Sequence, residues 1–84
     1  MAKKIRYKEV IEYFLKHGYT IERHGSHIVI RSPSNRLILL PQMRANSAVS
    51  HMHTAVIKHC LQSESEEDLE CFEAEVEAAS KPLH

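Results

Sequence analysis

The stretch 22-ERHGSHIVIRSP-33 alternates apolar and polar residues in its second half, which is the pattern of a β-strand with one buried face. Because successive side chains of a strand point to opposite faces, Ile28 and Ile30 are predicted to point into the core. His27 and Arg31 are then predicted on the opposite face. The stretch therefore predicts a histidine and an arginine on the exposed side of a short strand.

The residues around this strand predict a helix before it and one further strand on each side. Residues 7–17 have helical spacing, and Gly18 is a typical residue just after a helix end. The apolar stripe of this helix is predicted to be Val10, Ile11, Phe14 and Leu15. Strands are expected over residues 19–23, 26–31 and 36–41, with a turn over 32–35. Three short strands with tight links predict an antiparallel meander.

The second half of the chain predicts two more helices. The first should begin near Asn46 or Ser47 and carry a stripe of Val49, Met52, Val56 and Cys60. The second should begin at a capping box of Ser63 and Glu66, end at Pro82 and carry a stripe of Leu69, Phe72, Val76 and Ala79. The expected fold is α+β in the order α-β-β-β-α, with an extra acidic C-terminal helix. Its helices should cover one face of the sheet and leave the other open.

Charge divides the 84 residues into two parts. Residues 1–62 hold ten Lys or Arg against three acids, a net charge of +7, and residues 63–84 hold one Lys against eight acids, a net charge of −7. We expect residues 1–62 to form one small domain and residues 63–84 to form an acidic helical extension. A basic domain favours a polyanionic partner such as RNA.

Other classes of protein are disfavoured by the sequence. No apolar run approaches the ~20 residues that a membrane-spanning helix needs, and no apolar segment follows the basic start. A cytoplasmic location without membrane contact is therefore expected. Cys60 and Cys71 both fall in helical patterns, which favours thiols over a disulfide framework.

His27 has two interpretations. Imidazole exchanges protons near neutral pH, so a histidine beside basic residues can catalyse RNA cleavage by general acid or base catalysis. The alternative is a surface histidine on a solvated strand. Gly25 and Ser26 likewise form either a phosphate-binding turn or a simple hairpin turn. The arginines that suit phosphate contacts are Arg23, Arg31 and Arg44.

A metal site is disfavoured by the spacing of the histidines. His51 and His53 are two residues apart, and His53 and His59 are six apart, so neither pair shares one face of a helix. The chain has no HExxH or CxxC motif. We therefore expect no metal and no cofactor.

The sequence YKEVIEYFLKHGYTIERHGSHIVIRSPSNRLILLP, residues 7–41, resembles the HicA family of small toxins, also called YcfA-like. The shared features are a helix ending at Gly18, an aromatic Tyr19, the run Gly25-Ser26-His27, a Pro-containing turn and a strand ending at Pro41. The resemblance extends over residues 7–62. It implies a fold like that of a double-stranded RNA-binding domain and cleavage of mRNA through one histidine. It also implies neutralisation by a HicB-type antitoxin protein.

Carried over to this chain, the resemblance makes His27 the catalytic residue and Gly25 and Ser26 the turn that positions it. The first hypothesis is thus a metal-independent endoribonuclease whose backbone contacts come from Arg23, Arg31 and Arg44. A second hypothesis is an RNA-binding module of the same fold that does not cleave. A third is a protein-interaction domain whose acidic helix mediates a homodimer.

Overall fold

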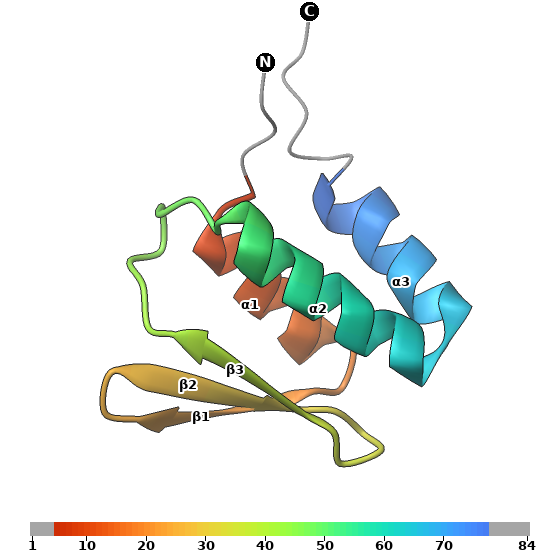
Figure 1. Ribbon diagram of the computed structural model, residues 1–84, viewed down its shortest axis with the longest axis horizontal. Coiled ribbons are helices and arrows are strands. Elements are labelled where there is room, and N and C mark those ends of the chain that lie inside the picture. The colour runs from red at the N-terminus through yellow and green to blue at the C-terminus, as the bar shows by residue number, and fades with distance from the viewer. Residues whose placement is uncertain (1–4, 78–84) are drawn as a thin grey trace, which may run out of the picture.

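The computed structural model describes residues 5–77 and contains a three-stranded sheet with its helices on one side (Figure 1). The strands are β1 (Thr20–His24), β2 (His27–Arg31) and β3 (Leu37–Pro41), which pair antiparallel in the order β1-β2-β3. The helices are α1 (Tyr7–Lys16), α2 (His51–Glu64) and α3 (Glu66–Phe72), and a π-helical turn, η1 (Glu73–Glu77), follows α3. The predicted α+β class and antiparallel sheet are confirmed.

Apolar pairs between β2 and β3 fix the register of the sheet. Ile28 lies opposite Leu40, and Ile30 lies opposite Ile38. These four side chains are almost fully buried. A slip of one residue would turn each slipped strand's apolar side chains outward, so the hydrophobic effect strongly favours the observed pairing.

Both turns of the sheet contain one residue with a positive φ. Gly25, in the two-residue turn between β1 and β2, has φ +64°, where a side chain would be strained. Asn35, before β3, has φ 75°, which Asn tolerates better than most residues. The Arg31 guanidinium donates a hydrogen bond of 2.6 Å to the Asn35 side-chain oxygen, which holds this turn against the end of β2.

The inward face of α1 differs in part from the predicted stripe. Val10 and Phe14 are fully buried as expected, and Ile11 is half-buried against the core. Leu15, however, is 57% exposed, and Tyr13 is buried instead. The reason lies in α3, because the Tyr13 ring packs edge-on against Phe72 at 5.3 Å between ring centroids. Local spacing alone does not reveal this partner.

The predicted start of α2 was wrong, and its predicted inward face was right only in part. Val49 is buried but precedes the helix, and Cys60 is half-buried against the core. The N-cap is Ser50, whose hydroxyl accepts a hydrogen bond from the His53 backbone N–H at 3.1 Å, rather than Asn46 or Ser47. The side chains that face the core are Ile57 and Leu61, both fully buried. The exposed fractions of Met52 and Val56, which were expected to be buried, are 70% and 43%.

The start of α2 is delayed because the chain before it is bonded to the beginning of α1. The Tyr7 N–H donates to the Ser47 carbonyl at 2.8 Å, and the Val49 N–H donates to the Ile5 carbonyl at 2.8 Å. Arg6 and Ala48 form the antiparallel bridge between these bonds. Backbone groups engaged in this bridge are not available for helical hydrogen bonds.

The C-terminal helix begins two residues later than predicted. The Ser65 hydroxyl accepts a hydrogen bond of 3.0 Å from the Asp68 N–H, whereas Ser63 still lies within α2 and donates to the His59 carbonyl. The expected inward positions Phe72 and Val76 are buried in the same core as α1 and the sheet. Leu69, also predicted to point inward, is half-buried against this core. The predicted Ala79 and Pro82 lie outside the described residues.

Candidate functional site

The face of the sheet that points away from the helices is called the open face here (Figure 1). Its residues alternate along the strands with the buried isoleucines and leucines. They are Thr20, Glu22 and His24 of β1, His27, Val29 and Arg31 of β2, and Leu37, Leu39 and Pro41 of β3. Within residues 5–77, no helix covers this face.

His27 is the first residue of β2 and is exposed on the open face. Its Nδ1 atom lies 3.3 Å from the hydroxyl oxygen of the neighbouring Ser26. Gly25 has open space where a Cβ atom would be, so the tip of the hairpin is accessible from this side. The turn thus orients the imidazole ring through its contact at Nδ1.

Sequence reasoning missed a second histidine at the same place. His24, the last residue of β1, is the direct cross-strand partner of His27. Residues that are directly opposite in a sheet point to the same face, with Cβ atoms about 4.5–5.5 Å apart. The signal was present in the run HGSH, because a two-residue turn places the residues on either side of it opposite each other.

A carboxylate supports the second histidine. Glu22 lies two residues before His24 and so on the same face of β1, and its Oε1 atom is 3.1 Å from His24 Nε2. The two side chains are 51% and 61% exposed, respectively, so the contact forms at the surface and is screened by solvent. The open face therefore carries a Glu22–His24 pair beside His27.

The three arginines expected to bind RNA do not gather around His27. Arg31 shares the open face with it, but lies four positions farther along β2, at a distance of about 13 Å. Arg23 pairs with the buried Ile28 and so projects to the helix side of the sheet. Arg44 lies exposed in the loop after β3. The direction of Arg23 could be predicted from the alternation of β1, because Arg23 lies two positions after the inward Ile21 and therefore points to the same face.

Arg23 contributes instead to a hollow on the helix side. This hollow has a volume of about 300 Å³ and lies between α1, β1 and the loop after β3. Its apolar lining includes Tyr7, Ile11 and Met43, and Lys8 and Arg23 add positive charge. The sheet separates this hollow from the imidazole of His27.

The open face also carries an apolar area next to the histidines. Val29 lies opposite Leu39 and is half-buried, while Leu37 and Leu39 are 51% and 63% exposed. Large apolar side chains that share one exposed face are typical of a surface that contacts a ligand or another protein. The face is thus histidine-rich at the hairpin tip and apolar along β3.

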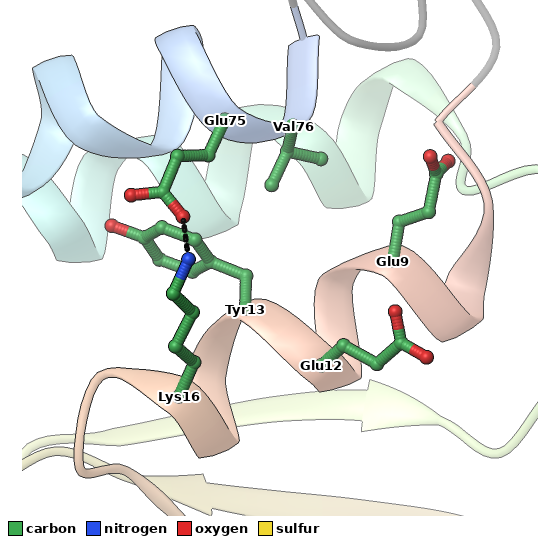
Figure 2. A pocket seen from close by; sticks show the side chains of 6 residues that line it. All are labelled: Glu9, Glu12, Tyr13, Lys16, Glu75 and Val76. Carbon is green, nitrogen blue, oxygen red and sulfur yellow. Dashed lines mark hydrogen bonds and ion pairs between the residues drawn. The ribbon is translucent and has the colours of Figure 1, made fainter.

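The described part of the acidic C-terminal segment, α3 and η1, lies on the side of the molecule away from the open face (Figure 1). It encloses, with α1, a hollow of about 200 Å³ (Figure 2). Lys16 of α1 is 3.2 Å from a Glu75 oxygen, and His17 Nε2 is 3.2 Å from the other oxygen. Hydrogen bonds from His17 and Lys16 lower the pKa of Glu75. These contacts hold η1 on the helix layer.

Residues 5–77 contain no group of three His, Cys, Asp or Glu side chains that could hold a metal ion. No helix in this range has the length and apolar character needed to cross a membrane. Cys60 and Cys71 are both free thiols.

The groups at the hairpin tip can exchange protons with a bound molecule. Both imidazoles are accessible. One ring nitrogen of each contacts a neighbouring side chain, and the other has no such contact with any residue from 5 to 77.

Comparisons of the chain with protein-family models, with curated proteins and with solved structures found no match.

Proposed function

We propose that this protein is a metal-independent endoribonuclease of the HicA toxin type, which cleaves mRNA with His27 as a general acid or base. The observation that supports this best is the position of His27, which is exposed at the hairpin tip with its ring oriented by Ser26. The α-β-β-β-α order and the run Gly25-Ser26-His27 agree with the resemblance to that family.

The proposed reaction needs only proton transfer and charge stabilisation. A base removes the proton of a ribose 2′-hydroxyl, and the 2′-oxygen attacks the adjacent phosphorus. The bond from phosphorus to the 5′-oxygen breaks, and that oxygen takes a proton from an acid. The products are a 2′,3′-cyclic phosphate and a 5′-hydroxyl. His27 Nε2 is suited to a proton transfer because Ser26 engages Nδ1.

The RNA is proposed to lie on the open face. Gly25 leaves room for the RNA backbone at the turn, the Ser26 hydroxyl is exposed beside it, and Arg31 adds positive charge farther along β2. Arg23 and Arg44 would contact RNA only where it passes the edges of the sheet. In the cell, this proposal implies a cytoplasmic location and control by a HicB-type antitoxin protein.

The proposal is tested by incubating a single-stranded oligoribonucleotide with the purified full chain in EDTA. Wild type is expected to cleave it and to leave cyclic phosphate ends, whereas His27→Ala should cleave at least about 100-fold more slowly. His59→Ala is the matched control, because His59 is also exposed but lies on α2. An intact oligoribonucleotide after long incubation with folded wild type would rule out the nuclease.

A second candidate function is protein binding through the open face. The exposed fractions of Leu37 and Leu39, 51% and 63%, favour it. An antitoxin or a second copy of the chain would then cover these side chains. If this face is the contact, wild type should sediment as a dimer and the variant with Ser at both positions should sediment as a monomer. A dimer that survives both substitutions would rule this face out.

A non-cleaving RNA-binding module is separated from the nuclease by the same variants. RNA affinity should survive His27→Ala in both cases, but only the nuclease has a cleavage rate to lose. Binding that weakens as salt is raised would support contact with the phosphate backbone in either case.

A further inference from the structure

We propose that His24, held by Glu22, is the second catalytic group of this site and supplies the proton to the leaving 5′-oxygen. This inference rests on the proposed ribonuclease function. It assigns the general acid to His24 and the general base to His27, so that both proton transfers have a named residue.

The placement of the two histidines is the first reason. They are direct cross-strand partners at the end of the hairpin, and both are exposed on the open face. Their Cβ atoms are about 4.5–5.5 Å apart by the geometry of such pairs, so their rings can reach opposite sides of one phosphate. The two-residue turn fixes this spacing.

The second reason is that the described strands offer no other proton donor near His27 on the open face. In β1 and β2, the titratable and charged groups that share the face with His24 are Glu22, His27 and Arg31. In β3, the residues on this face are Leu37, Leu39 and Pro41, which carry no charge. Arg31 lies about 13 Å from His27 along β2, which is too far for it to be the acid.

The contact with Glu22 distinguishes the two ring nitrogens of His24. Glu22 Oε1 lies 3.1 Å from His24 Nε2. In the doubly protonated ring that a general acid needs, the Nε2–H group donates to Glu22 and the Nδ1–H group is available for the leaving oxygen. No described carboxylate contacts His27, and its Nδ1 atom meets the Ser26 hydroxyl instead.

The proton balance of the step is complete. With Nδ1–H of His27 donating to Ser26, the lone pair on Nε2 takes the proton of the 2′-hydroxyl as the bond from the 2′-oxygen to phosphorus forms. As the bond from phosphorus to the 5′-oxygen breaks, His24 transfers its Nδ1 proton to that oxygen. His24 ends neutral and His27 ends charged, and solvent restores both.

The test compares two substrates that differ in their need for an acid. One is an oligoribonucleotide, whose leaving alkoxide must be protonated. The other is a nitrophenyl ester of a nucleoside 3′-phosphate, whose leaving group departs without a proton. The variants are His24→Gln, Glu22→Gln, His27→Ala and the control His59→Gln, each in the full chain with EDTA. Because His24 is 61% exposed at its side chain, replacing it should not disturb the core.

We expect His24→Gln to slow RNA cleavage at least about 100-fold while leaving cleavage of the nitrophenyl ester within a fewfold of wild type. The same variant should remove the fall in kcat/KM at alkaline pH that a general acid causes. Glu22 is a positioning residue, so Glu22→Gln should slow RNA cleavage less than His24→Gln does and should also leave cleavage of the nitrophenyl ester within a fewfold of wild type. His27→Ala should lose activity on both substrates.

The outcomes separate this inference from the proposed function. If wild type and His24→Gln cleave RNA equally while His27→Ala does not, the nuclease stands and the role of His24 is wrong. If His24→Gln loses both substrates equally, His24 is not the acid. If wild type cleaves neither substrate, the proposed function and this inference fail together.

Discussion

At the scale of single residues, two buried tyrosines differ in their hydroxyl groups. The Tyr13 hydroxyl donates a hydrogen bond of 3.1 Å to the Asp68 carbonyl. The Tyr19 hydroxyl is also buried, but no described residue forms a hydrogen bond with it. A buried polar group without a partner costs free energy, whereas a satisfied hydrogen bond contributes about 1 kcal/mol.

Tyr13→Phe should therefore lower the free energy of unfolding by about 1 kcal/mol, as estimated for a lost hydrogen bond. Tyr19→Phe should leave it unchanged or raise it, because the substitution removes an unsatisfied group and keeps the ring. Urea unfolding of the two variants beside wild type measures the difference. A larger loss in Tyr19→Phe than in Tyr13→Phe would contradict this description of the core.

The buried phenol of Tyr19 also predicts a loss of stability at alkaline pH. Burial raises the pKa of Tyr19 from 10.0 to about 12 in the folded chain. A phenol whose folded pKa is raised contributes stability that is complete below pH 10 and is lost as the pH rises towards 12. Burial also raises the pKa of Tyr13, with the same sign. Urea midpoints should fall over this range and fall less in Tyr19→Phe. An equal fall in both proteins would count against a buried Tyr19 phenol.

At the scale of single elements, the sheet could be predicted from the sequence and the register of α2 could not. The alternation of Ile28 and Ile30 is a local property of β2, and it placed His27 on the open face. The start of α2 depends on a bridge between Arg6 and Ala48, which are distant in sequence. Asn46 and Ser47 have side chains that are typical of N-caps, but the backbone next to them is engaged in this bridge, which local sequence does not reveal.

This assignment of the cap predicts a selective effect. Ser50→Ala should lower the free energy of unfolding by about 1 kcal/mol, a typical loss for an N-cap. Ser47→Ala is the control, because Ser47 contributes a backbone carbonyl, not its side chain, to the contact with Tyr7. Thermal unfolding should rank Ser50→Ala below Ser47→Ala, and the reverse order would favour the earlier cap.

The candidate site was predictable in part for the same reason. His27, Gly25 and Ser26 lie within one hairpin, so their proximity follows from adjacent residues. The cross-strand pairing of His24 with His27 could also be predicted from the spacing HGSH, because a two-residue turn places these residues opposite each other. The distribution of the arginines was predictable only in part. The alternation of β1 places Arg23 on the helix side, whereas the position of Arg44 depends on how its loop is bonded to α1.

At the scale of the whole molecule, the described acidic elements α3 and η1 pack on the helix layer and do not cover the open face (Figure 1). Phe72 and Val76 complete the core. Lys58 of α2 reaches Glu73 at 3.2 Å and Glu77 at 2.8 Å, and these hydrogen bonds raise its pKa. The negative charge of the C-terminal segment is thereby kept away from the face proposed to bind RNA.

Burial of Phe72 predicts that the acidic segment is needed for stability. Phe72→Ala should lower the free energy of unfolding by about 3–5 kcal/mol, the usual range for a buried phenylalanine. Cys71→Ala, at the exposed neighbouring position, should change it by less than about 0.5 kcal/mol. Urea unfolding measures both. Equal stability of the two variants would mean that the segment is not packed on the core.

The most direct measurement for the central claim is the single-turnover cleavage rate of one oligoribonucleotide, with its binding measured beside it. Wild type and His27→Ala are compared in EDTA, after both are shown to unfold at the same temperature. We predict equal RNA affinity and a cleavage rate that falls at least about 100-fold in His27→Ala. Equal cleavage rates, or no cleavage by either protein, would contradict a nuclease centred on His27.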